Sequence, residues 1–129
     1  MASKPMQRSL KHLRDRGWQC APVERWIPYP PDVQKKLGMP GIRVDVWGFG
    51  DILACRRFRP DGVALVEVWE IALFQTTDIT SMAKHRTKME NLVELRRWKE
   101  AGGLAFLHAW GKKGPRGKRK TFVLTEIPL

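Results

Sequence analysis

Apolar and polar positions follow two different periods along the chain, which predicts both helices and strands. Residues 4–16 place Leu10 and Leu13 on one face and stop before Gly17, so we expect a helix there. Residues 18–26 read as a strand, and Pro22 indicates that this strand lies at a sheet edge or carries a bulge. Residues 27–42 contain four prolines and two glycines, which predicts a surface loop that could cover a site.

The middle of the chain predicts a long hairpin. Residues 51–58 and 63–77 both have strand-like apolar runs, and Pro60-Asp61-Gly62 between them is a turn signal. The second run is apolar on both faces in its middle, which is typical of a central strand.

The last part predicts a helix followed by two strands. The helix is expected to begin at Thr80 or Ser81 and to end near Ala101, before two glycines. Its buried face is expected to comprise Met82, Met89, Leu92 and Val93. Strands are predicted at 104–110 and 121–127. The order α-β-β-β-α-β-β indicates one α/β domain over residues 1–129 with a mixed central sheet, and residues 1–5 are expected to be flexible.

Composition agrees with one packed domain and adds a strong charge. The chain has 129 residues, 43% of them hydrophobic, with 24 Lys and Arg against 13 Asp and Glu, giving a net charge of +11. Such a charge is typical of proteins that bind nucleic acid. A membrane partner is not expected, because no apolar run could span a bilayer and no bulky amphipathic helix stands out. No secretory signal is visible, so we expect a cytoplasmic protein, in the host cytoplasm if the source is viral.

Basic residues concentrate in three regions. Residues 111–120 carry six Lys or Arg among ten positions, interleaved with glycine and proline, and are expected to form a mobile loop that contacts phosphate. The first predicted helix and the second also have basic faces. The residues expected to bind nucleic acid are Arg8, Lys11, Arg43, Lys84, Lys112, Lys113, Arg116, Lys118, Arg119 and Lys120.

Candidate metal chemistry centres on Asp51, which begins an apolar strand directly after Gly50. Gln75 and Thr77 end the next strand and share a face, because side chains alternate. Magnesium takes oxygen ligands and usually one or two carboxylates. Counting about the Asp61-Gly62 turn pairs Asp51 nearer Ile71 than Gln75, so a bulge or a displaced turn is needed to bring Gln75 level.

Other carboxylates remain candidates for completing such a site. Glu67 shares the face of Gln75, Glu70 does not, and Asp45 and Glu24 precede Asp51 in the chain. Ordinary structural roles compete: Asp51 could cap a turn, and Glu24 could pair with a neighbouring arginine.

Three short stretches carry a resemblance to a known family: Val23-Glu24-Arg25-Trp26, Phe49-Gly50-Asp51-Ile52-Leu53-Ala54 and Phe74-Gln75-Thr76-Thr77. With the order of elements, they resemble the PD-(D/E)XK nuclease superfamily over residues 8–110. They are most similar to a phage and prophage branch related to Holliday junction resolvase-like endonucleases. The resemblance implies a restriction-endonuclease-like core and hydrolysis of branched or duplex DNA with Mg²⁺ or Mn²⁺. It also suggests a homodimer that makes two symmetric cuts.

The resemblance assigns roles residue by residue. Asp51 matches the metal-binding aspartate, Gln75 the acidic position and Thr77 the lysine position, and Glu24 resembles the upstream glutamate of resolvases. Lys88 on the following helix could replace the missing lysine. The expected catalytic set is therefore Glu24, Asp51, Gln75 and Lys88, with the metal held by Asp51, Glu24 and Gln75. The degenerate Gln-x-Thr motif supports one alternative, a DNA- or RNA-binding protein on the same fold that has lost catalysis. The net charge of +11 is also compatible with another, an anion-binding structural or virion-assembly protein.

Overall fold

The computed structural model describes residues 3–58, 67–113 and 121–129, and its central element is strand β5, Val68–Asp78. Successive side chains of a strand point to opposite faces of the sheet. Ala72 and Phe74 accordingly pack in one buried cluster, while Leu73 packs in another. The apolar run that predicts a central strand therefore forms one that is buried on both faces.

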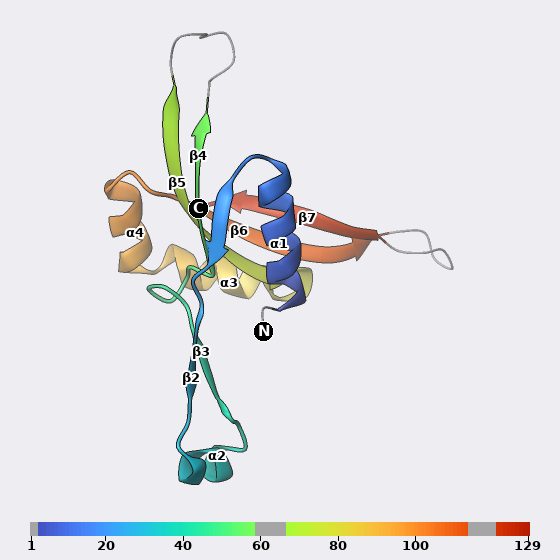
Figure 1. Ribbon diagram of the computed structural model, residues 1–129, viewed down its shortest axis with the longest axis vertical. Helices are drawn as coiled ribbons and strands as arrows, with labels where there is room; N and C mark the ends of the chain where they lie inside the picture. The colour runs from blue at the N-terminus through green and yellow to red at the C-terminus, as the bar shows by residue number, and fades with distance from the viewer. Residues whose placement is uncertain (1–2, 59–66, 114–120) are drawn as a thin grey trace.

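A mixed sheet of five strands surrounds β5, in the order β1-β4-β5-β6-β7 (Figure 1). The other strands are β1 (Gln19–Pro22), β4 (Ile52–Phe58), β6 (Leu104–Lys113) and β7 (Thr121–Pro128). Strands β5 and β6 are parallel, and the other pairs are antiparallel. Pro22 lies on the edge strand β1, as predicted, where its missing N–H removes no bond from the interior of the sheet.

Helices cover both faces of this sheet, which makes a small α/β domain of three layers. Helix α1 (Lys4–Asp15) packs Leu10 and Leu13 against the face of Phe74. On the other face, α3 (Met82–Glu90) and α4 (Val93–Glu100) bury Met89 and Leu95. Among the residues that the structure describes, no helix combines the length and apolar character that crossing a bilayer would require.

Residues 3–5, within the segment expected to be flexible, lie at the start of α1. The Ser3 side chain accepts a hydrogen bond from the backbone N–H of Met6, and Lys4 and Pro5 form the first turn of α1. Residues 1 and 2 lie outside the described part of the chain.

The single helix predicted between residues 80 and 101 is wrong, because the segment forms two helices. A 3-10 turn, η1 (Ile79–Ser81), leads into α3. After Asn91, Leu92 adopts an extended conformation with φ −82° and ψ 125° and packs partly buried in the second core. This turn lets both short helices bring an apolar side chain onto the same sheet face. Leu95 and Trp98 take the packing role expected of Val93, which is 38% exposed.

Residues 18–26 do not form one strand, and residues 27–42 are not an irregular loop. Strand β1 ends at Pro22, and β2 (Arg25–Pro28) instead pairs with β3 (Gly41–Val44) in a separate two-stranded sheet. Helix α2 (Pro31–Leu37) connects them. Figure 1 shows this hairpin and its helix extending away from the body of the domain. We call residues 25–44 the arm.

The register of β4 against β5 brings the two candidate site positions together. Ile52 pairs with Phe74, and the backbone N–H of Asp51 donates to the Phe74 carbonyl at 2.9 Å. Asp51 therefore lies level with Gln75, and the count that placed it nearer Ile71 is wrong because Ile71 pairs with Cys55. The pairing is regular from Ile52↔Phe74 to Phe58↔Val68, so these described pairs contain no bulge and have a register shifted from the one counted about Asp61-Gly62.

Candidate functional site

Asp51 is a buried carboxylate whose two oxygens have different surroundings. Its side chain lies at the start of β4 and is 3% exposed. Oδ2 accepts hydrogen bonds from Gln75 Nε2 at 3.0 Å, from the Thr76 backbone N–H at 2.8 Å and from Thr76 Oγ1 at 3.0 Å. Oδ1 is buried without a hydrogen-bond partner. Because leaving a buried acceptor unpaired costs about 1–3 kcal/mol, Oδ1 is the atom to which a ligand is expected to bind.

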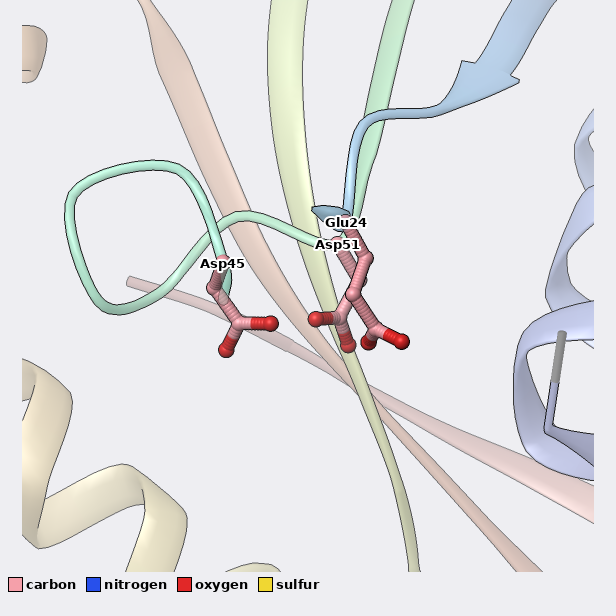
Figure 2. A group of neighbouring side chains, drawn as sticks. All are labelled: Glu24, Asp45 and Asp51. Carbon is pink, nitrogen blue, oxygen red and sulfur yellow. The ribbon is translucent and has the colours of Figure 1, made fainter. Parts of the chain in front are cut away.

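Two further carboxylates converge on Asp51. Glu24 lies between β1 and β2, and Asp45 follows β3 directly, so these two residues stand at the two ends of the arm. One ligand oxygen from each of Glu24, Asp45 and Asp51 lies within 4.8 Å of the others. Figure 2 shows the three carboxylate groups close together on the segments that precede β2, follow β3 and lead into β4. Oxygen ligands in this number fit Mg²⁺ or Mn²⁺ with water completing the shell.

The cluster holds more negative charge than its surroundings neutralise. Burial is the main cause that raises the pKa of Asp51 to about 8, and the neighbouring Asp45 carboxylate raises it further against the hydrogen bonds from Thr76. Burial also raises the pKa of Glu24, although Arg43 opposes this through an ion pair at 3.4 Å. A divalent cation among these groups would relieve both the repulsion and the unpaired oxygen.

Gln75 lies where the register predicts, but its role in this structure is that of a hydrogen-bond donor. The side chain is 5% exposed, and its amide nitrogen faces Asp51 Oδ2. Thr77 is also buried, two residues further along β5. Gln75 therefore orients the aspartate, and the oxygen ligand that the sequence assigned to it is not turned toward Asp51.

Helix α3 places His85 on the side of Asp45. The pKa of His85 is lowered, first by burial and then by Lys88, and is raised by the Asp45 carboxylate. Lys88 is exposed on α3, one turn after His85, and no hydrogen bond or ion pair within the described residues joins it to Asp51. Sequence reasoning assigned no role to His85. Its spacing of three residues before Lys88, on the helix that follows the site strand, is the signal that could have found it.

Glu67 and Glu70 pair with arginines away from the cluster. Arg56 Nε contacts Glu70 at 3.0 Å and Arg57 Nη1 contacts Glu67 at 3.5 Å, at the far end of the β4–β5 hairpin. Asp45, which sequence reasoning left as one of several alternatives, is the acid that the fold brings to Asp51.

The predicted nucleic-acid contacts fall into separate groups. Arg8 of α1 and Lys112 of β6 both lie over the Phe122 ring, with centroid distances of 3.3 and 5.2 Å. Lys11 pairs with Asp15 at 2.8 Å, and Arg43 pairs with Glu24. Lys84 and Lys113 are exposed at α3 and at the end of β6. Strand β6 thus extends into the predicted mobile loop, whose remaining residues, including Arg116, Lys118, Arg119 and Lys120, lie outside the described part.

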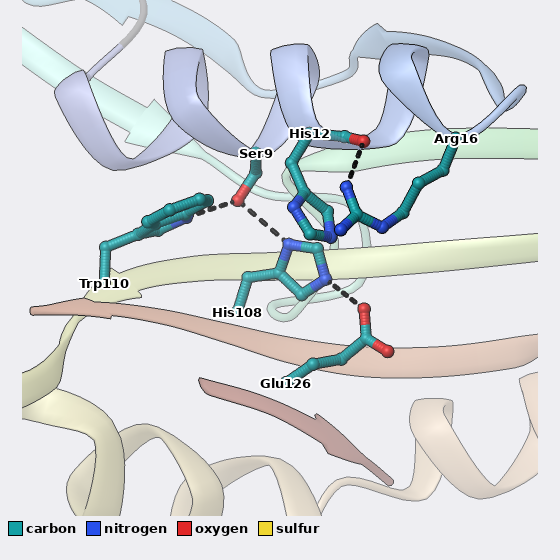
Figure 3. A network of polar contacts seen from close by, with 6 residues as sticks. All are labelled: Ser9, His12, Arg16, His108, Trp110 and Glu126. Carbon is teal, nitrogen blue, oxygen red and sulfur yellow. Dashed lines mark hydrogen bonds and ion pairs between the residues drawn. The ribbon is translucent and has the colours of Figure 1, made fainter. Parts of the chain in front are cut away.

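Figure 3 shows a second polar cluster, in which a serine, a histidine and a glutamate are hydrogen-bonded as in a hydrolytic triad. Its burial indicates a structural role. His108 is fully buried, with Nδ1 3.0 Å from Ser9 Oγ and Nε2 2.7 Å from Glu126 Oε2. Ser9 is also fully buried, and its hydroxyl accepts a hydrogen bond from Trp110 Nε1 at 2.8 Å. Because Ser9 is buried, no substrate could reach it. The hydrogen bonds of the cluster instead connect α1 to β6 and β6 to β7.

Comparison of the chain with protein-family models, with curated proteins and with solved structures returns no match. The carboxylate cluster and the distribution of charge are the features of the chain that bear on its function.

Proposed function

We propose that this chain is an endonuclease that cleaves DNA with the help of Mg²⁺ or Mn²⁺, on a restriction-endonuclease-like core. The observation that carries the proposal is the unpartnered Oδ1 of Asp51, which is buried beside Glu24 and Asp45. A carboxyl group that is buried beside two others is costly to ionise, and such an arrangement is rarely retained without a partner or a metal. A divalent cation is the partner that three converging carboxylates fit best.

Asp45 supplies the negative charge that the Gln-x-Thr motif lacks. Gln75 stands at the position where the resemblance expects an acid, which would leave the site one negative charge short. Asp45 brings a carboxylate to the same cluster from the loop after β3. Three carboxylates are then available to a cation. One of them, Asp45, follows the arm, whereas the resemblance expects this acid on β5.

The proposed division of labour assigns binding and orientation to different residues. Asp51, Asp45 and Glu24 hold the ion, which supplies the Lewis acidity that activates water and neutralises charge on the phosphate. Gln75 and Thr76 fix the Asp51 carboxylate through its other oxygen. His85, which lies beside Asp45, and Lys88, one turn further along α3, position the phosphate or the water.

DNA is the proposed substrate because the chain carries a net charge of +11. Arg8 and Lys112, held beside the exposed Phe122 ring, offer a basic and aromatic contact for the phosphate backbone. Branched DNA and action as a homodimer follow from the resemblance to junction resolvases and are part of the proposal.

One observation favours a second candidate, a protein that binds nucleic acid without cutting it. The Gln75 amide nitrogen occupies the space beside Asp51, and Thr77 offers no positive charge in place of lysine. In this alternative the basic surface still binds DNA, but the cluster does not support hydrolysis.

Direct metal binding is the first test. Calorimetric titration of the protein with Mn²⁺ is expected to show one site, and Asp45→Asn is expected to weaken it at least about tenfold, since even outer-shell partners contribute 10- to 100-fold. Glu94→Gln is the matched control, because it removes the same charge from α4 outside the cluster. Equal Mn²⁺ affinity in the wild type and Asp45→Asn would refute the proposed site.

Cleavage is the second test. The protein is incubated with duplex, single-stranded and four-way-junction DNA in Mg²⁺, Mn²⁺ or EDTA, beside Asp51→Ala and Glu94→Gln. We expect metal-dependent cutting, strongest on the junction, that Asp51→Ala abolishes and Glu94→Gln preserves. Tight binding with no cutting of any DNA would favour the second candidate. Binding that ignores DNA form and collapses with salt would favour an anion-seeking structural protein.

A further inference from the structure

The arm is the part of the molecule that the proposed chemistry leaves unexplained. Its two strands pair with each other in a separate sheet. Within the described residues, β2, β3 and α2 make few contacts with elements outside the arm. Six of its apolar side chains are nonetheless exposed, namely Trp26, Ile27, Leu37, Met39, Ile42 and Val44. A hairpin of two strands is only marginally stable alone in water, so we expect the arm to bind a partner through its exposed apolar side chains.

Charge identifies the kind of partner. The arm carries four basic residues, Arg25, Lys35, Lys36 and Arg43, against one acid, Asp32. Two arms of the same positive charge would repel each other if they faced one another, whereas a polyanion would attract the arm. Two-stranded ribbons can enter a groove of DNA, and proteins that bind the minor groove insert apolar side chains such as Leu and Met between base steps as wedges.

The tip of the arm carries two apolar side chains, Leu37 and Met39, that could enter between base steps, and we call this pair the wedge. Leu37 and Met39 are 51% and 49% exposed, and they flank Gly38, which ends α2 in the left-handed conformation at φ 68°. Lys35 and Lys36 immediately precede them on α2. Apolar side chains are thus presented next to positive charge, so that Lys35 and Lys36 can contact phosphates and add affinity while Leu37 and Met39 enter between bases.

The base of the arm connects this tip to the carboxylate cluster. Glu24 immediately precedes β2 and Asp45 immediately follows β3, so two of the three carboxylates hold the two strands where they leave the body. The Arg43–Glu24 ion pair links the arm to the cluster a second time. A cation bound there would tie both ends of the arm to Asp51, and the orientation of the arm would depend on the same site that binds the metal.

We propose that the arm enters a DNA groove and that Leu37 and Met39 unstack a base step at a set distance from the phosphate at the carboxylate cluster. This inference rests on the proposed DNA substrate. The four residues of β2 alone span about 13 Å at ~3.3 Å per residue. At ~3.4 Å per base pair, the unstacked step lies about four base pairs or more from the scissile phosphate.

The test uses the full chain and DNA duplexes that carry 2-aminopurine at successive positions, in EDTA and in Mn²⁺. The wild type is expected to raise the fluorescence at one step, about four base pairs or more from any cut. Leu37→Ser/Met39→Ser is expected to lose this rise and keep the Mn²⁺ affinity. Lys35→Ala/Lys36→Ala is expected to keep the rise and to reduce the salt dependence of binding by about 1.8 in log–log slope. Val93→Ser, an exposed aliphatic change on α4, is the control.

The outcomes separate this inference from the proposed function. If the wild type cuts DNA but the wedge variant unstacks bases as well as the wild type does, the wedge is refuted while the nuclease stands. If the wild type unstacks one step but cuts nothing, the nuclease is refuted while the wedge stands. A wedge variant that changes the sedimentation coefficient of the free protein would show that the arm joins two copies of the chain, which also overturns the inference.

Discussion

Asp51→Asn is expected to make the metal-free protein more stable, although it removes the central residue of the proposed site. The change keeps an oxygen that can accept the bonds from Gln75 and Thr76 at Oδ2. The new amide nitrogen takes the place of Oδ1, which has no partner, and can donate to the neighbouring carboxylates. The substitution therefore removes a carboxyl group that must take up a proton on folding at neutral pH, without removing its hydrogen bonds.

The size of the effect follows from the pKa of Asp51, which rises from 3.8 to about 8 on folding. A carboxyl group with a raised pKa stabilises the folded state when protonated, and this contribution is lost as pH rises from about 4 to 8. Each pH unit in that window costs about 1.4 kcal/mol. At pH 7 the wild type therefore pays about 4 kcal/mol that Asp51→Asn does not, whereas near pH 4 the difference falls below about 1 kcal/mol.

Urea unfolding at pH 4, 5.5 and 7 in EDTA measures this difference. Asp78→Asn is the contrasting control, because hydrogen bonding from the Thr80 side chain lowers the pKa of the exposed Asp78, so its loss should destabilise the protein above pH 4. Mn²⁺ at 100 times its dissociation constant should restore about 2.7 kcal/mol to the wild type and nothing to Asp51→Asn. An Asp51→Asn protein that is less stable at pH 7, or whose advantage does not change with pH, would refute the reasoning.

Three other changes test separate parts of the structure. Ser9→Ala removes the hydroxyl shared by a buried imidazole and an indole, and should lower the free energy of unfolding by about 2–4 kcal/mol in urea while leaving Mn²⁺ binding unchanged. Gly41→Ala places a Cβ 2.5 Å from the Ile27 carbonyl oxygen, so it should distort the arm, seen as faster proteolysis of residues 25–44, with little effect on unfolding of the body. Lys112→Ala should reduce the log–log salt dependence of DNA binding by about 0.9, whereas Lys99→Ala on α4 should not.

The elements of the main sheet were predictable because their signals are local. The apolar run of β5, the proline at the edge strand and the leucines of α1 each follow from the period of their own segment. The order of helix and strands was correct for the body of the domain. The arm was missed because prolines and glycines indicate a loop equally well whether or not the flanking residues pair.

The break between α3 and α4 was missed for a different reason. Asn91 and Leu92 are not strong helix terminators in the sequence, and the helix ends there because Leu92 gains a place in the core. Packing against the sheet outweighs a weak local preference.

Asp51 and the basic character of the chain could be identified from sequence alone, because a carboxylate after glycine at a strand start and a charge of +11 are visible without a fold. Which acids join Asp51 was decided by the tertiary structure. The displaced hairpin register brings Gln75 level with it as a donor, ion pairs hold Glu67 and Glu70 elsewhere, and the arm carries Asp45 back to the site. The local pattern of apolar and polar residues determines the helices and strands. Whether residues far apart in the chain meet depends on strand register and packing, which the pattern within one segment does not reveal.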